Sequence, residues 1–558
     1  MSDNDQAAAV NAKMRELGVL EPGTTSTSGT SDDGPPVLPP LELPRDGWGL
    51  DDFAREAGKV TRLNGVFRRD RIAVTINKET GQVDTIDSDE FRTYLADLAF
   101  LFKWKATPSA PGEPPAAPHR VKVTMSKDTA GGTLKSPQFL GQQRKLSRVN
   151  AVRQPIMRAD GRIELLPEGY DPESGVFTMS SDVAIREDMP IEEAREILLD
   201  LHREFPFCDW SHLAIEDRRE SRELAKQVAT MVAFYATLLL PHTIKRQGTL
   251  YNANTHRSGK TLLAQIVVIP VQGRCKLRSK PDSPEEFRKV LDSTALGASP
   301  YLVLDDLTGR LSNQDLNSFM TTPWWAGRLM NSQREFEVPI QTNVFLTGHN
   351  LDTSGDIAGR VLEVRLHVEE ADVQQHSVRR VINEHWLSKP EVRADLCSAL
   401  FALVRHWDEQ KRPEGKSVKP GFESWCRMFG GIVEAAGFGD PLERRPTDET
   451  TDPEFEDMRA LVTHLMTGST EKVVEVRYDE LIAVCQEQSL FTWIIEGKWQ
   501  KNGDERTFEP SGRCNSRLGL LWSRKYGGRV FHIEDGRSVR FGTRGRQRHK
   551  VYCLSVEE

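Results

Sequence analysis

Apolar residues gather in short continuous runs in the middle of the chain, and these runs predict the strands of a buried sheet. Residues 301–304 (YLVL) and 342–346 (TNVFL) are the clearest examples; residues 248–265 (GTLYNANTHRSGKTLLAQ) look like a strand, a tight loop and a helix start, and segments with helical periodicity lie between these stretches. Strands that are apolar throughout are typical of a parallel sheet covered by helices on both faces. The pattern therefore predicts an α/β fold built on a parallel sheet.

The rest of the chain divides by changes in composition and periodicity. A leader rich in Ser, Thr, Gly and Pro cannot bury enough apolar surface to become ordered, and we expect it to be disordered. Asp160-Gly161 and Asp171-Pro172 predict turns of hairpins in residues 153–177. The predicted order is a disordered leader (1–48), a small α+β module (49–107), a Pro-rich linker (108–118), a β-rich and helical region (119–204), the sheet domain (205–385), a helical domain (386–470) and a C-terminal domain (471–558).

Composition excludes several classes of protein. The net charge of -8 argues against a nucleic-acid coat protein, and seven scattered cysteines without a C-x-x-C pair indicate neither a disulfide framework nor a zinc finger. The amino terminus is polar and acidic rather than a signal peptide. The longest apolar run, residues 228–241, is shorter than the roughly 20 residues of a bilayer span, so we expect a cytoplasmic protein without a membrane partner.

A phosphate-binding loop is the first candidate site. Residues 254–261 read NTHRSGKT, close to the pattern G-x-x-x-x-G-K-[ST], with Asn254 in place of the first Gly. Backbone amides around Ser258 and Gly259 would hold the phosphates of ATP, Lys260 would reach the β and γ oxygens, and Thr261 would bind Mg²⁺. Asn tolerates positive φ, so the turn can survive, and Asn254→Gly would speed hydrolysis if the loop is strained. The alternative is a helix start that merely contains Gly.

Polar residues follow the next two apolar strands. Asp305 and Asp306 end the strand at 301–304; Asp305 would serve the Mg²⁺ site, and the second carboxylate would orient the attacking water. Asn350 would hold that water against the γ-phosphate, with His349 as the alternate candidate. Ligands of parallel sheets bind beyond the carboxyl ends of the strands, where all three clusters fall. The alternatives are a helix-capping Asp pair and a turn Asn.

Two arginines lie near a short strand further along the chain. Arg360 and Arg365 are in the segment GDIAGRVLEVRL, and an arginine supplied to the γ-phosphate of a neighbouring subunit would couple hydrolysis to a ring. Both could equally be ordinary surface arginines.

The carboxy-terminal region is basic. Residues 511–550 hold eleven basic and two acidic residues, a net charge of +9 in a chain of net charge -8. A helix near 515–526 followed by Gly-turned strands predicts a winged helix that places the helix in a major groove of DNA. The alternative is a solvated basic face. The predicted DNA-binding residues are Arg513, Arg517, Arg524, Lys525, Arg540, Arg544, Arg546 and Arg548.

These motifs together resemble the AAA+ ATPase module of phage, plasmid and poxvirus-type primase-helicases, close to helicase superfamily three. The resemblance is carried by SGKT, VLDDL, residues 324–351 (WWAGRLMNSQREFEVPIQTNVFLTGHNL) and residues 355–366, and by the hairpin segment PIMRADGRIELLPEGYD. It implies ATP-driven translocation on DNA by a hexameric ring in the replication of a mobile element. By position, it implies that Lys260 and Thr261 hold phosphate and Mg²⁺, Asp305 and Asp306 form the acidic pair, Asn350 is the sensor, and Arg360 is the inter-subunit finger.

The resulting expectation is a P-loop AAA+ ATPase core with a parallel sheet, an N-terminal α+β region and a C-terminal winged-helix-like domain. Its ligands would be ATP and Mg²⁺, and its partners DNA, further copies of itself and replication proteins. Two alternatives stay open: a non-translocating, ATP-switched initiator or loader, and a DNA-binding regulator whose nucleotide site has decayed. The first 150 residues lack the clustered acids or zinc ligands of a primase, so priming is not expected.

Overall fold

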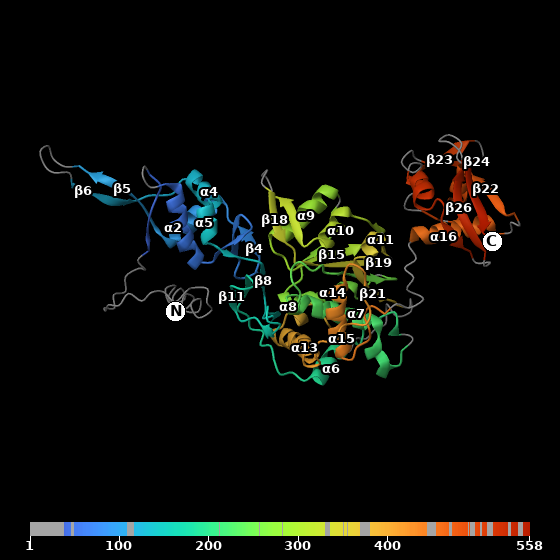
Figure 1. The fold of residues 1–558 in the computed structure, drawn as a ribbon, viewed down its shortest axis with the longest axis horizontal. Coiled ribbons are helices and arrows are strands. Elements are labelled where there is room, and N and C mark those ends of the chain that lie inside the picture. Colours follow the sequence, from blue (N-terminus) through green and yellow to red (C-terminus); the bar gives the residue numbers. More distant parts are fainter. Residues whose placement is uncertain are drawn as a thin grey trace. The chain divides into compact units, whose positions relative to one another are not determined.

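The structure is a computed structural model whose described residues fall into two compact units, divided near residue 443 (Figure 1). It describes residues 38–45, 49–108, 116–210, 213–255, 257–281, 283–329, 335–349, 351–353, 355–368, 380–443, 453–467, 471–488, 490–491, 497–502, 505–510, 517–533, 537–544 and 551–557.

A five-stranded parallel sheet forms the centre of the first unit. Its strand order is β14-β15-β19-β13-β21, and every neighbouring pair is parallel. The predicted α/β class with a parallel sheet is confirmed. The strands are β13 (Gly248–Ala253), β14 (Leu277–Arg278), β15 (Tyr301–Leu307), β19 (Asn343–His349) and β21 (Val361–Leu366).

Both faces of this sheet are buried at its centre, which explains why apolar residues stand at successive positions of β15. Along β15, Leu302 and Leu304 enter one hydrophobic core and Val303 enters the other, as the two-residue period of a strand requires. The face that includes Val303 is covered by α6 (Ile191–His202), α7 (Arg222–Tyr235), α8 (Lys260–Gln272), α13 (Pro390–Glu409) and α15 (Gly431–Ala435).

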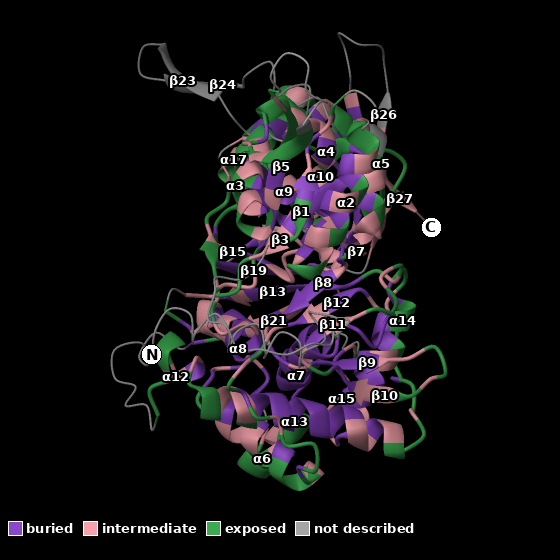
Figure 2. Cartoon of the chain, turned by 90° about the vertical axis from the view of Figure 1, so that its left-hand side faces the viewer, coloured by how far each residue is buried: buried purple, intermediate pink, exposed green. Residues whose placement is uncertain are grey.

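The other face is covered by α9 (Pro284–Leu296), α10 (Gln314–Thr321) and the hairpin of β17 (Trp324–Arg328) and β18 (Glu335–Pro339). Figure 2 shows α7 and α13 largely buried. Because α13 and α15 belong to the core of the sheet whereas α16 (Pro453–Met466) belongs to the second unit, the predicted helical domain 386–470 is divided between the two units.

The region before the sheet combines helices and strands. One small sheet has the order β1-β5-β6, with β1 (Pro40–Glu42), β5 (Phe100–Thr107) and β6 (Ala116–Lys122). Residues 40–42 are therefore strand rather than disordered leader, and residues 116–118 are strand rather than linker, because both pair with β5. A second sheet, β4-β3-β2-β7, and four helices complete it: β2 (Val66–Arg69), β3 (Ile72–Ile76), β4 (Val83–Thr85), β7 (Arg144–Lys145), α2 (Leu50–Leu63), α3 (Ser88–Leu98), α4 (Lys127–Lys135) and α5 (Pro137–Gln142).

Both hairpins predicted before the sheet are present. β9 (Pro155–Met157) pairs with β10 (Ile163–Leu165), and Gly161 in the turn between them has a φ of 85°. β11 (Gly169–Asp171) pairs with β12 (Val176–Thr178). In addition, β12 pairs in parallel with β8 (Arg148–Asn150), a contact that hairpin chemistry alone does not predict.

The second unit is built on an antiparallel sheet of order β22-β27-β26-β25. The buried Trp522 lies in its core, on a helical segment spanning residues 517–525 where a helix was predicted. The other elements are β22 (Val473–Arg477), α17 (Tyr478–Glu487), the hairpin of β23 (Gly497–Asn502) and β24 (Glu505–Pro510), β25 (Val530–His532), β26 (Ser538–Arg544) and β27 (Val551–Glu557). Across the described part of the chain, no helix is both long and apolar enough to cross a membrane.

Candidate nucleotide-binding site

The NTHRSGKT segment joins the carboxyl end of β13 to the start of α8, the position predicted for a phosphate loop. Gly259, directly before the helix, has a φ of 90°, and a Cβ there would lie 3.0 Å from the ring of Phe205. Arg257 also has positive φ, at 59°. Gly is therefore required at position 259 both by backbone conformation and by the ring packed beneath it.

Asn254 has a different role from the one predicted. It is not among the described residues with positive φ, so the departure from Gly does not strain the turn. Its side chain instead holds the backbone of Val368, because Nδ2 donates to the Val368 carbonyl at 2.8 Å and Oδ1 accepts from the Val368 N–H at 3.0 Å. His349 Nε2 donates to the Asn254 carbonyl at 3.1 Å. Asn254 thus ties the start of the loop to the chain that follows β21.

Lys260 begins α8 and is 6% exposed. Its Nζ donates to the Thr255 carbonyl at 3.1 Å and lies 3.3 Å from Ser258 Oγ, so acceptors of the loop hold the ammonium. Burial lowers the pKa of Lys260, and the charges of Asp306 and Asp305 oppose that shift. A buried ammonium that faces replaceable loop acceptors at a helix N-terminus can exchange them for phosphate oxygens.

A triangle of hydrogen-bonded residues, Thr261, Asp305 and Thr347, joins helix α8 to strands β15 and β19. Asp305 Oδ1 accepts from Thr261 Oγ1 at 2.8 Å and from Thr347 Oγ1 at 2.6 Å. Thr347 Oγ1 in turn accepts from the backbone N–H of Asp306 at 3.0 Å. Thr347 is fully buried in β19, and sequence reasoning missed it although it immediately precedes the Gly-His-Asn segment. The predicted juxtaposition of Thr261 with the first aspartate is present.

The two aspartates do not have equivalent settings. The pairing of β15 with β19 shifts register between Leu304 and Leu307, and Asp306 within that irregularity has a φ of 54°. Asp305 is half-buried and Asp306 is exposed. A bulge re-aims side chains and left-handed conformation is uncommon for a non-Gly residue, so the backbone turns the two carboxylates apart.

The triangle fits a magnesium site of the kind that phosphates complete. Mg²⁺ in nucleotide sites is held by one or two protein oxygens together with substrate phosphates, and the Thr261 hydroxyl and Asp305 carboxylate are suitable oxygens. Among the described residues, no group of three His, Cys, Asp or Glu side chains could hold a metal by itself. Asn350, the predicted sensor, lies outside the described residues.

The two candidate arginines lie at opposite edges of the sheet. Arg365 pairs in register with Asn252, near the loop, whereas Arg360 precedes the pair Gly248–Val361 at the other end of β13. With about 3.3 Å per residue, roughly 20 Å of strand separates Arg360 from the start of the loop. The Arg360 side chain bonds to Asp356. Arg360 is therefore remote from the loop of its own chain.

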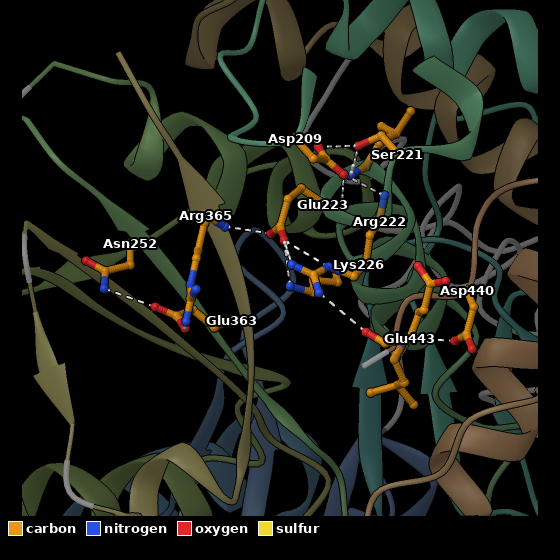
Figure 3. Close-up of polar contacts among 12 residues, drawn as sticks. Asp209, Ser221, Arg222, Glu223, Lys226, Asn252, Glu363, Arg365, Asp440 and Glu443 are labelled. Carbon is orange, nitrogen blue, oxygen red and sulfur yellow. Dashed lines mark hydrogen bonds and ion pairs between the residues drawn. The ribbon is translucent and has the colours of Figure 1, made fainter. Parts of the chain in front are cut away.

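Arg365 belongs to a polar network beside the loop strand (Figure 3). Its guanidinium donates to Glu363 Oε2 at 2.8 Å, and Glu363 Oε1 accepts from Asn252 Nδ2 at 3.0 Å. Burial would raise the pKa of Glu363, but the charge and hydrogen bonds of Arg365, with the bond from Asn252, lower it. The Arg365 N–H donates to the buried Glu223, which also pairs with Lys226 at 2.7 Å. The network fixes β21 against β13 and α7.

The predicted DNA-binding residues are only partly within the described structure. Arg517 is exposed at the start of its helix. Arg540 and Arg544 lie on β26, where Arg540 is exposed, pairs with Glu557 and donates to the Gly528 carbonyl at 3.0 Å. Arg524, Lys525 and Arg544 are in described elements without described side chains, and Arg513, Arg546 and Arg548 lie outside the described residues.

Comparison with known proteins adds resemblance but no assignment. No protein-family model matches the sequence, and no curated protein matches it. Among solved structures, the apo C-terminal region of NrS-1 is 10% identical with a TM-score of 0.37, covering 82% of this chain and 99% of that one. JCV helicase is 14% identical with a TM-score of 0.22, covering 48% of this chain and 70% of that one. Similarity at these TM-scores is too low to argue from, so the function must be argued from the site itself.

Proposed function

We propose that this chain is an AAA+ type ATPase that uses ATP hydrolysis to move along or remodel DNA in the replication of a phage, plasmid or other mobile element. One observation carries the proposal: Thr261, in the first turn of α8 directly after the SGK tripeptide, donates to Asp305 near the carboxyl end of β15. That contact joins a phosphate loop to an acidic strand end, the pair of features that nucleotide hydrolysis requires.

Each loop residue has a role in binding ATP. Backbone N–H groups at the start of α8 would hold the phosphates, and Lys260 would exchange its bonds with Thr255 and Ser258 for bonds with β and γ oxygens. Thr261 and Asp305 would hold Mg²⁺, which when bound neutralises charge that develops between those phosphates. Thr347 orients Asp305, because its hydroxyl donates to the same oxygen that Thr261 contacts.

Hydrolysis needs a water in line with the γ-phosphorus. Asp306, exposed and turned away from its neighbour, is the carboxylate we assign to orienting that water. The water oxygen forms the new bond to phosphorus while the bond from phosphorus to the β-γ bridging oxygen breaks; ADP leaves, and the proton of the water leaves with the inorganic phosphate. Arg360 would act on the site of a neighbouring copy, since its own loop is at the opposite edge of the sheet. A homo-oligomeric ring is therefore part of the proposal.

DNA binding is assigned to the second unit. The net charge of +9 over residues 511–550 supports it, because counterion release from the phosphate backbone is the main source of non-specific affinity. Arg540 on β26 has an exposed side chain. Deletion of residues 444–558, which removes α16 together with the sheet it packs on, should lower DNA affinity and leave basal hydrolysis intact, and unchanged affinity would contradict this assignment.

The test is ATP hydrolysis by the full chain with and without forked DNA, alongside strand displacement and particle mass in the presence of ATP. We expect stimulation by DNA, and Lys260→Ala should lower the rate by at least about 100-fold. Lys289→Ala is the matched control, since Lys289 is an exposed lysine on α9 bonded to Glu286. Hydrolysis without strand displacement would identify a non-translocating switch, and hydrolysis unaffected by Lys260→Ala would contradict the proposed site.

A further inference from the structure

Two arginines are buried where the N-terminal region meets the sheet. Arg69, the last residue of β2, is 2% exposed, and Arg148, the first residue of β8, is 1% exposed. Arg69 donates to the carbonyls of Ser147 at 2.8 Å and Ala295 at 2.9 Å. Arg148 donates to Asn150 Oδ1 at 3.1 Å and to the Gln341 carbonyl at 3.2 Å. Both guanidinium groups are therefore held in place by neutral acceptors.

Neither arginine has a carboxylate partner within the described part of the chain, unlike the buried Arg222, which pairs with Glu223 at 3.1 Å. Arg69 Nε and one terminal nitrogen of Arg148 have no hydrogen-bond acceptor there. Burial lowers the pKa of Arg69 to about 10 and, together with the charge of Arg246, lowers the pKa of Arg148 to about 9. Both groups stay charged at neutral pH, and unpaired buried charge costs several kcal/mol per ion.

Both arginines line one cavity of about 10 Å³, which also borders Ser147, Gln341 and Thr342. That volume holds about one water-sized sphere. Its walls include the end of α9 and the segment directly before β19. The cavity thus lies at the amino edge of the sheet, opposite the edge that carries the nucleotide loop.

We propose that this cavity is a binding site for one small inorganic anion such as chloride, held between Arg69 and Arg148. An anion would accept hydrogen bonds from Arg69 Nε and from the unused terminal nitrogen of Arg148, and it would neutralise charge that no described protein group neutralises. A water molecule could accept the same bonds and donate to the unpartnered Gln341 Oε1, but it would leave both charges uncompensated. The anion would stabilise the junction between β2, β8 and the amino ends of β15 and β19.

The first test is the melting temperature of the full chain in sodium chloride and in sodium gluconate at equal ionic strength. Gluconate is too large for the cavity, so chloride should raise the melting temperature by about 2–4 °C. Arg148→Met should remove this difference. Arg393→Met is the control, because Arg393 on α13 donates to the Pro270 carbonyl at 3.0 Å and does not line the cavity, and the chloride effect should persist.

The second test does not depend on a variant that folds. Crystals of the wild-type chain grown with bromide should give an anomalous peak between Arg69 and Arg148. Ordinary water density without such a peak would overturn the proposal, as would equal melting temperatures in chloride and gluconate. Either result leaves the nucleotide site unaffected, because that site lies at the opposite edge of the sheet.

Discussion

The two edges of the central sheet both hold buried cations, but the surroundings of those cations differ. At the carboxyl edge, the negative charges of Asp305 and Asp306 act on Lys260. Its ammonium group bonds to loop atoms that a ligand can replace. At the amino edge, Arg69 and Arg148 line a small cavity and have no described carboxylate partner. The carboxyl edge is therefore suited to a ligand that binds and leaves, such as ATP. The amino edge is suited to an ion that stays bound.

Parallel topology explains why exchange belongs at the carboxyl edge. Loops that follow β13, β15 and β19 converge there, and side chains from separate elements meet, as in the contacts of Asp305 on β15 with Thr261 on α8 and with Thr347 on β19. At the amino edge the chain enters the strands through short, bonded turns, for example where Thr342 donates to the Ser299 carbonyl at 2.7 Å. The following predictions test this division.

The largest expected effect concerns Arg360, an amino-edge residue that the division assigns to a neighbouring subunit. Arg360→Ala should lower the rate of hydrolysis about 1,000-fold, the scale of an arginine finger. Mixing Arg360→Ala with Lys260→Ala subunits should restore activity, since each supplies what the other lacks. Hydrolysis measured across a series of mixing ratios checks this. Mixtures as inactive as their components would show that the arginine does not act between subunits.

The next effect is a loss of folding stability at acid pH, caused by the buried His202 beside Phe205, the residue that packs against Gly259 of the loop. His202 is fully buried beside Phe205, and burial lowers its pKa from 6.5 to about 4. Below pH 6.5 the unfolded chain takes up a proton that the folded chain does not, so stability falls as the pH drops from about 6.5 to about 4. The loss is about 3 kcal/mol.

Chemical denaturation across that pH range measures the effect. His202→Leu should flatten the pH dependence by this amount, whereas the exposed His385→Leu, the control, should leave it unchanged. An identical slope in wild type and His202→Leu would show that burial of this imidazole does not cause the acid sensitivity.

A smaller effect is expected at Asn254. Asn254→Gly removes two hydrogen bonds to Val368, so it should lower stability by about 1–3 kcal/mol without speeding hydrolysis. Asn254→Asp keeps the acceptor and loses the donor, and should fall between the two. Thermal unfolding and steady-state hydrolysis of the three proteins check the order. Faster hydrolysis by the Gly variant at unchanged stability would restore the view that this residue strains the loop.

The sequence permits prediction of features that depend on local spacing. The SGKT tetrad, the strand at 301–304 and the parallel sheet follow from patterns within a few residues, because strand burial and helix starts are local properties. The pair of hydrogen bonds between Asn254 and the backbone of Val368 joins residues 114 positions apart and has no local sequence pattern. Arg69 and Arg148 are likewise indistinguishable by sequence from surface arginines, since only the tertiary fold buries them.

Arg360 and Arg365 lie at opposite ends of β21, and the sequence could not predict which of them is near the loop. That follows from the register of β21 on β13. The predicted limits of the helical domain, 386–470, differ from those of the structure for a related reason. The apolar faces of α13 and α15 are as periodic as those of an independent helical domain, and only their shared core with α7 and α8 assigns them to the sheet.

Equilibrium binding of a fluorescent, non-hydrolysable ATP analogue in the presence of Mg²⁺ tests the carboxyl-edge site most directly. The wild-type chain should bind it, Lys260→Ala should bind at least about 10-fold more weakly through loss of a charge-assisted bond, and Lys289→Ala should match the wild type. Equal affinity of all three proteins would contradict the assignment of this edge to ATP.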